Sequence, residues 1–300
     1  MPSLFPLVMI MGAVDAFART IVTITRNPKL LLIPLVISII LSPISAYLVN
    51  EMPMFEGIPE LQEGDNESII FEEHGAFSEE MLNELADFFK LLMVFMVVSL
   101  LLQALSEYAV IKGALIAEEG REYSLVDLIY EGIMHVFHVF LVVLIVGIVS
   151  FAIILVPIFV FGLLFLVSGG NPAFVLLIFL VELPLALLVV GAGSMAVPIY
   201  VLNNSIVASL RCFSLAFKNK LSTVAFGALL TLSIFFLLAV PASFVGLLFL
   251  GRTDFMANLI ANLLQAPFQA LIQTLTAVGG LMLYLELSKK EKEELLELEF

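Results

Sequence analysis

Apolar residues run through this chain in stretches too long for the core of a soluble domain. A helix needs about twenty mainly apolar residues to cross a hydrocarbon layer of about 30 Å. Six stretches meet this requirement: approximately Lys29–Leu48, Phe88–Ile116, Val136–Val167, Ala173–Tyr200, Leu221–Leu250 and Phe255–Leu287. They lack the alternation of apolar and polar residues that marks a transmembrane barrel strand. The pattern predicts an all-α, polytopic transmembrane helix bundle with six spans, forming a single integral membrane domain over residues 1–300.

The composition excludes the soluble alternatives. Of the 300 residues, 61% are hydrophobic and only 13% are charged, whereas a soluble domain is roughly a quarter charged. The net charge of −14 argues against a nucleic-acid partner. The single cysteine, Cys212, excludes an intramolecular disulfide framework and a Cys-based metal cage. We expect the lipid bilayer as the main partner and no cofactor; membrane-protein partners and a homo-oligomer both stay open.

Basic residues set the expected orientation. Eleven of the 13 lie at alternate connections: Arg19, Arg26, Lys29; Lys112, Arg121; Arg211, Lys218, Lys220; Lys289, Lys290, Lys292. Because Lys and Arg are retained on the cytoplasmic side of membranes, we predict a multi-pass protein of the cell membrane with both termini in the cytoplasm.

Three segments at these connections have the spacing of amphipathic surface helices. In the first, Asp15, Arg19, Thr23 and Arg26 share one helical face, and Val14, Phe17, Ile21 and Ile24 share another. The second is Ser205–Leu221 and the third is Ser124–His138. Helices of this kind lie in the membrane interface, so the sequence predicts three cytoplasmic interfacial amphipathic helices.

The first two segments also match each other at an offset of 192 residues. Arg19 aligns with Arg211, Arg26 with Lys218 and Asn27 with Asn219. The repeating unit would be a surface helix followed by two spans. Three copies of it would make a threefold internal repeat, and internal repeats are common in membrane proteins. Coincidence among apolar sequences is the alternative.

At these residues the chain resembles a prokaryotic family of six-span membrane proteins of unknown function. The family is similar to the membrane domain of some glycerophosphodiester phosphodiesterases. The resemblance rests on Ala13–Arg26, on Asn27, Pro28, Lys29 and the run Leu30–Leu35, and on Ser205–Leu221. It implies a six-helix membrane module. The catalytic phosphodiesterase domain is absent from this chain, so the resemblance does not imply hydrolysis.

The predicted outer connection, residues 50–87, is strongly acidic. It contains twelve Asp and Glu residues and no Lys or Arg, so we expect much of it to be extended or mobile. Helical spacing at Ser78–Leu91 predicts a helix that leads into the second span. The pair Gly169–Gly170 predicts a turn and Gly279–Gly280 predicts close helix packing. The acidic tail, residues 288–300, is expected to extend the last span as a helix in the cytoplasm.

The sixth span carries a stripe of amide side chains. Its members are Asn258, Asn262, Gln265, Gln269 and Gln273, with Thr276 beyond, at intervals of three and four residues. This spacing places all of them on one helical face. Since lipid cannot satisfy amides, the stripe faces protein or water. It forms either one wall of a polar passage or a set of interhelical hydrogen bonds that fix packing.

Two carboxyl side chains lie within predicted spans. Glu182 is near the middle of the fourth span, two residues before Pro184, and Glu107 lies in the second span nearer the cytoplasmic end. A carboxylate at the centre of a span costs roughly 3 kcal/mol on insertion scales. We expect Glu182 to be protonated or hydrogen-bonded inside the bundle, either as an ion or proton site or as a structural contact.

Asp127, Glu131, His135 and His138 share one helical face at the start of the third span. Carboxylate and imidazole together can hold a transition metal, so Glu131, His135 and His138 are weak metal candidates. One helix face rarely supplies enough converging ligands for a metal ion. The preferred interpretation is therefore that these four residues form the water-facing side of an interfacial helix.

No motif for a nucleophile, a phosphate-binding loop or a zinc protease is present, so the expected protein is not an enzyme. Two functions remain. The preferred one is a non-catalytic membrane scaffold or accessory module. The alternative is a solute or ion carrier or channel, with a path between Glu182 and the polar face of the sixth span.

Overall fold

The computed structural model describes residues 5–51, 79–250, 252 and 254–298. Its long helices are α1 (Phe5–Arg26), α2 (Leu32–Asn50), α3 (Glu79–Glu118), α4 (Leu125–Val167), α5 (Ala173–Asn203), α8 (Lys220–Leu248) and α9 (Phe255–Leu298). A 3₁₀ turn, η1 (Pro28–Leu31), links α1 to α2, and two short helices, α6 (Ile206–Ser209) and α7 (Arg211–Lys218), link α5 to α8. No strand occurs in these residues, and the all-α prediction is confirmed.

Six helical segments are long and apolar enough to cross a membrane, which indicates a multi-pass membrane protein. They are Pro28–Asn50, Leu85–Glu118, Leu125–Val167, Ala173–Asn203, Lys220–Leu248 and Phe255–Glu291. These ranges match the six predicted stretches closely. The third differs most, because the amphipathic segment at Ser124–His138 and the span after it form one uninterrupted helix, α4.

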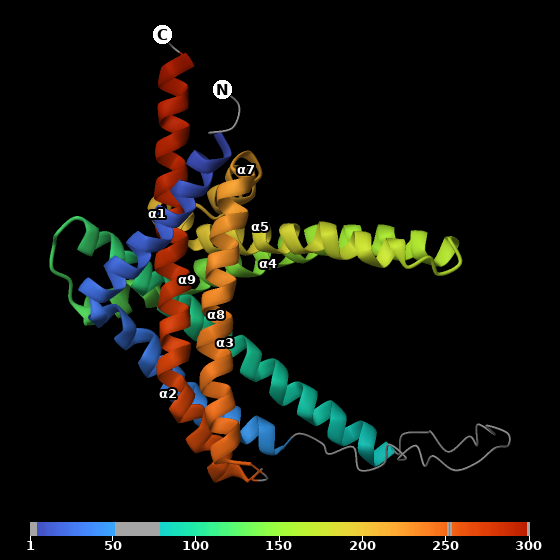
Figure 1. The fold of residues 1–300 in the computed structure, drawn as a ribbon. Coiled ribbons are helices and arrows are strands. Elements are labelled where there is room, and N and C mark those ends of the chain that lie inside the picture. The colour runs from blue at the N-terminus through green and yellow to red at the C-terminus, as the bar shows by residue number, and fades with distance from the viewer. Residues whose placement is uncertain (1–4, 52–78, 251, 253, 299–300) are drawn as a thin grey trace.

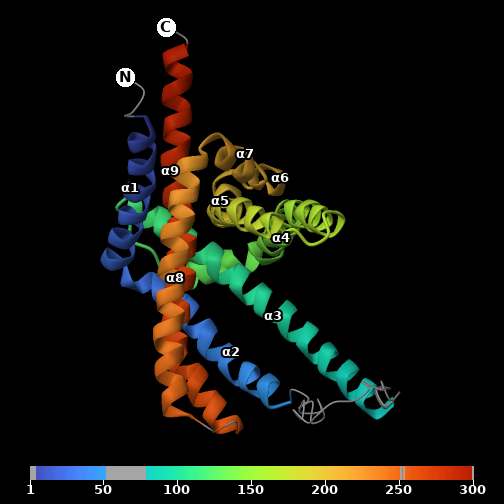
Figure 2. The same ribbon diagram turned by 45° about the vertical axis from the view of Figure 1, so that its right-hand side comes forward.

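The helices α4 and α5 form one hairpin and α8 and α9 another, and α9 also packs against α1, α2 and α5 (Figure 1). The α4/α5 hairpin extends away from the others, across the direction of α8 and α9, while α2 and α3 diverge from each other. Figure 2 shows α6 and α7 near the end of α8 at which the chain enters it. In the most apolar stretch of α9, 61% of residues are buried, against 11% in α5. The α9 helix is therefore the central helix of the fold.

Glycines bring α5 into backbone contact with α8 and α9. A Cβ added to Gly280 on α9 would overlap the carbonyl oxygen of Ser194 on α5, and one added to Gly227 on α8 would overlap that of Leu187. A Cβ at Gly191 would lie 2.7 Å from the carbonyl oxygen of Thr223. Small residues allow helices in membranes to approach this closely. The close packing predicted at Gly279–Gly280 is confirmed.

The first helix packs along the C-terminal half of α9. Small and polar side chains of α1, among them Ala13, Ala16 and Thr20, are fully buried, whereas Val14 and Ile21 are exposed. The first turn of α1 and the last turn of α9 lie at the same end of the molecule (Figure 1). That α1, α7 and the start of α4 lie in a membrane interface stays a prediction, as does the threefold repeat.

Two residues of the predicted repeat have the same local geometry. Asn27 follows α1 and Asn219 follows α7, and the side-chain amide of each donates to the carbonyl oxygen four residues earlier, at 3.1 Å in both cases. The backbone N–H of each donates to the same oxygen. Each asparagine therefore lies between a helix that was predicted to be amphipathic and an apolar helix.

The helix ends agree with the sequence. Gly169 and Gly170 form the turn between α4 and α5 with positive φ angles of 73° and 85°, which glycine adopts without steric cost. The helix predicted at Ser78–Leu91 begins at Glu79 and continues as α3. The acidic tail is helical to Leu298 as part of α9. Most of the acidic connection, residues 52–78, lies outside the described residues.

Candidate functional site

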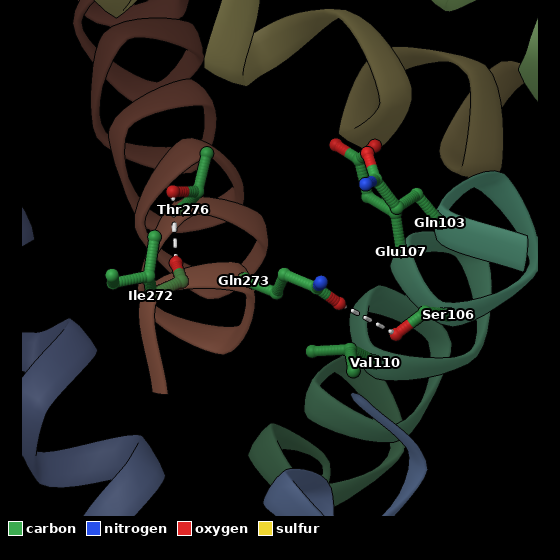
Figure 3. A pocket seen from close by; sticks show the side chains of 7 residues that line it. All are labelled: Gln103, Ser106, Glu107, Val110, Ile272, Gln273 and Thr276. Atoms are coloured by element: carbon green, nitrogen blue, oxygen red, sulfur yellow. Dashed lines mark hydrogen bonds between the residues drawn. The ribbon is translucent and has the colours of Figure 1, made fainter. Parts of the chain in front are cut away.

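A polar cavity of about 180 Å³ lies between α3 and α9. This volume has room for several water molecules, each of which occupies about 30 Å³ in the liquid. The cavity is lined by Gln103, Ser106, Glu107 and Val110 from α3 and by Ile272, Gln273 and Thr276 from α9. Figure 3 shows the side chains of Gln103 and Glu107 extending from α3, while Gln273 reaches across from α9. Polar groups from two apolar helices therefore share one cavity.

Helical spacing explains the wall that α3 contributes. Residues 103, 106, 107 and 110 recur at intervals of three, one and three, which places them on one helical face. Glu107 is half-buried and is the single charged side chain among the seven that line the cavity. Sequence reasoning found Glu107 but missed Gln103 and Ser106. Their spacing from Glu107 was the signal that could have revealed them, because it repeats the pattern of the stripe on α9.

The amide stripe of α9 faces other helices rather than lipid or solvent. Asn258, Asn262, Gln265, Gln269, Gln273 and Thr276 are all half-buried. The hydroxyl of Ser106 on α3 donates to Oε1 of Gln273 over 3.5 Å, a long hydrogen bond. The amide of Asn262 donates to the carbonyl oxygen of Ser42 on α2 over 3.4 Å. The stripe thus contacts α3 at one end and α2 further along.

Glu182 lies elsewhere, on the α4/α5 hairpin. The α5 helix meets α8 at Leu187. Glu182 lies five residues before Leu187 in α5, on the side of the α4–α5 turn. Both of its carboxylate oxygens are buried, and neither has a hydrogen-bond partner among the described residues. Glu182 is not one of the residues that line the α3/α9 cavity. The cavity therefore brings Glu107 and Gln273 together, and Glu182 stands apart from them.

The weak metal candidates at the start of α4 are engaged with protein groups. Glu131 pairs with Lys112 on α3 at 3.4 Å. Nδ1 of His135 lies 2.8 Å from the hydroxyl of Tyr200 on α5, and the His135 ring stacks on Tyr108 with centroids 4.7 Å apart.

His138 is exposed and stacks on the ring of Tyr200, with centroids 6.3 Å apart. In the described part of the chain, no group of three or more His, Cys, Asp or Glu side chains is placed to hold a metal ion. The arrangement is a histidine–tyrosine cluster that joins α3, α4 and α5. Sequence reasoning missed its two tyrosines, because they come from other helices.

The single cysteine is a core residue. Cys212 on α7 is completely buried, and burial raises the pKa of its thiol to about 12, against a weaker lowering by backbone hydrogen bonds. The thiolate is the nucleophilic form of cysteine, so the raised pKa and the burial both disfavour reaction of this side chain at neutral pH.

Comparison with known proteins assigns no family. The resemblance to the six-span family and to phosphodiesterase membrane domains stays a prediction that rests on the residues quoted for it. No protein-family model, curated protein or solved structure matches the chain.

Proposed function

We propose that this protein is a membrane carrier or channel for a small monovalent cation, which binds in the cavity between α3 and α9. One observation carries the proposal: a carboxyl group, two amides and two hydroxyls share a cavity that lies between two apolar helices. Ionisable residues within membrane spans are costly and are commonly kept for ion or proton pathways.

The chemistry of the cavity favours a cation of single charge. Hard cations bind oxygen ligands, and Glu107, Gln103, Gln273, Ser106 and Thr276 all offer side-chain oxygens. The cavity contains one carboxylate, so one bound monovalent cation leaves it neutral. A divalent cation would leave one uncompensated positive charge between two apolar helices, which is unfavourable.

The stripe on α9 extends the polar surface away from the cavity. From Gln273 to Asn258 the helix rises about 22 Å, at 1.5 Å per residue. Gln269, Gln265 and Asn262 lie between them on the same face. Such a series of amides offers successive polar contacts to a cation moving along α9. The path differs from the predicted one in its acid, which is Glu107 in place of Glu182.

The test is ion flux into proteoliposomes that contain the full-length protein. Sodium, potassium, ammonium and proton uptake are measured against empty liposomes and against three variants. Glu107→Gln should reduce the flux at least tenfold, because it removes the charge that holds the cation. Asp87→Asn is the matched control, since Asp87 is a carboxyl on the same helix that pairs with Lys90 outside the cavity, and it should keep wild-type flux.

Glu182→Gln separates the two paths. Loss of flux in Glu182→Gln but not in Glu107→Gln would refute the α3/α9 site and support a path past Glu182. Lowering the pH should reduce the uptake of sodium, potassium or ammonium in the wild type, because protonation of Glu107 removes the one negative charge in the cavity. Absence of flux for all four ions would refute the proposal.

A non-catalytic scaffold is the second candidate. It is favoured by the outer half of the α4/α5 hairpin, which exposes large apolar side chains such as Phe159 and Val167, 64% and 85% exposed. If the protein is a scaffold, the wild type shows no ion flux, and Glu107→Gln changes only the stability of the protein. The same proteoliposome experiment therefore distinguishes the two functions.

A further inference from the structure

A second pocket lies where α5, α7 and α9 meet, away from the α3/α9 cavity. It has a volume of about 120 Å³ and is lined by Ile199, Asn203, Arg211, Ser214, Leu215, Lys218, Tyr284, Ser288 and Glu291. Most of these side chains can donate hydrogen bonds, and two of them are cations. We infer that this pocket binds a phosphate group carried by a membrane lipid headgroup or free in solution.

The α7 helix supplies the cationic wall. It buries Cys212, Phe213, Leu215 and Ala216 against the rest of the protein. This leaves Arg211, Ser214 and Lys218 exposed at intervals of three and four residues, which places a guanidinium, a hydroxyl and an ammonium group on one helical face. Arg211 has no ion-pair partner among the described residues. An anion entering the pocket would therefore meet an uncompensated guanidinium.

The opposite wall completes a set of donors. Asn203 from α5 and Tyr284 and Ser288 from α9 also line the pocket. Glu291 is the one acidic lining residue, and its Oε1 accepts from Nζ of Lys218 at 2.7 Å. The lining therefore has a net charge of +1, although the whole chain carries −14. Hydrogen bonds between Arg or Lys and phosphate oxygens are among the strongest in proteins.

Size and position narrow the ligand to a phosphate group. Pockets for drug-sized ligands have volumes of about 300–1,000 Å³, so about 120 Å³ holds a phosphate group but not the sugar and base of a nucleotide as well. The pocket lies at the end of α5 and beside the start of α8 at Lys220, where two apolar helices end. Basic pockets at the ends of membrane helices bind anionic headgroups.

Thermal unfolding of the full-length protein tests this inference. The protein is purified in a maltoside detergent, which carries no phosphate, and phosphatidylglycerol or inorganic phosphate is added in separate arms. Potassium chloride of matched ionic strength is the control for screening. A ligand that binds the folded state raises the unfolding temperature, so at least one phosphate source should do so in the wild type.

Charge-matched variants assign the effect to the pocket. The double variant Arg211→Gln, Lys218→Gln should bind the phosphate source that stabilises the wild type at least tenfold more weakly. Lys29→Gln with Arg121→Gln is the control. It also removes two exposed cations from the predicted cytoplasmic face. Arg121 is ion-paired, and Lys29 has no ion pair among the described residues. The control should bind phosphate as the wild type does.

Glu291→Gln gives a prediction of opposite sign. It breaks the ion pair with Lys218, yet it should strengthen phosphate binding several-fold, because the competing carboxylate is gone. A purely structural role for these residues predicts a lower unfolding temperature and no gain in binding. This variant keeps the inference testable if the double substitution fails to fold.

The arms also separate the two sources. A shift with phosphatidylglycerol alone identifies a lipid headgroup as the ligand, and a shift with inorganic phosphate identifies a site that recognises phosphate itself. Equal behaviour of the pocket variants and the Lys29/Arg121 control, or no shift with either source, would overturn the inference.

Discussion

The contact between Gly280 on α9 and Ser194 on α5 makes the packing of the fold testable. In Gly280→Ala the new methyl group would overlap the carbonyl oxygen of Ser194 and lie 3.1 Å from its Cβ. The obstacle is backbone in the buried part of α5, so no side-chain rotation can relieve it. Non-bonded heavy atoms prefer separations of about 3.5 Å, and α5 and α9 must therefore move apart by about 1 Å or more.

The expected loss follows from the cost of overpacking. Extra methyl groups in well-packed cores destabilise by about 1–3 kcal/mol. Gly193→Ala is the matched control on α5, because a Cβ at Gly193 meets no atom within 4 Å. Replacing a helical glycine by alanine without a clash stabilises by about 0.4–1 kcal/mol. The two substitutions should therefore differ by more than about 1.4 kcal/mol in the free energy of unfolding.

Cys212 provides the assay. It is the sole cysteine of the chain and is fully buried, so a thiol-reactive fluorescent dye reports unfolding during a thermal scan in detergent. A change of 1 kcal/mol shifts the midpoint by about 2–4 °C in chains of 150–250 residues. Gly280→Ala should unfold at least about 3 °C below Gly193→Ala. Equal midpoints would refute the close contact between α5 and α9.

Three further predictions concern other parts of the molecule. Glu118→Ala should destabilise by about 1–3 kcal/mol, because the buried Thr23 hydroxyl donates to Glu118 at 2.7 Å; a double-mutant cycle with Thr23→Val that shows no coupling would contradict this. Cys212 of the folded protein should react slowly with maleimide at pH 8, since burial raises its thiol pKa to about 12. Its reaction rate should keep rising above pH 8.5, the usual pKa of a free thiol, and a plateau near pH 8.5 would contradict the burial. Tags at both termini should be accessible only from the cytoplasm, and labelling of the two ends from opposite faces would refute the predicted orientation.

The six spans could be predicted from sequence because hydropathy acts locally. Each span is a continuous apolar run, and a helix satisfies all of its own backbone hydrogen bonds without help from other segments. The same holds for the turn at Gly169–Gly170 and for the helical stripe at Asn258–Gln273. The helix predicted from Ser124 does start there, at Leu125. Its continuity with the third span was not predicted, since an amphipathic segment and the apolar run after it give no sign that a single helix covers both.

The candidate site was only half predictable, because it depends on which helices touch. The polar face of α9 is visible in the sequence, but its partner is not. Glu182 and Glu107 are both carboxyls within spans, and nothing local distinguishes the one that meets Gln273. Close approach of helices selects α3 and Glu107, and that approach depends on shapes along whole helices. The clustering of His135 with Tyr108 and Tyr200 was missed for the same reason.

The unbroken length of α4 has a mechanical consequence. The helix links the histidine–tyrosine cluster near one end to the tip at Val167, a distance of about 48 Å at 1.5 Å per residue, and Pro157 does not interrupt it. If the angle of α4 changed at the stacked rings of His135 and Tyr108, the displacement would grow with distance along the helix. A pivot of only 5° there would displace the far tip by about 4 Å. Small rearrangements of these rings would thus produce a larger displacement at the Val167 end of α4.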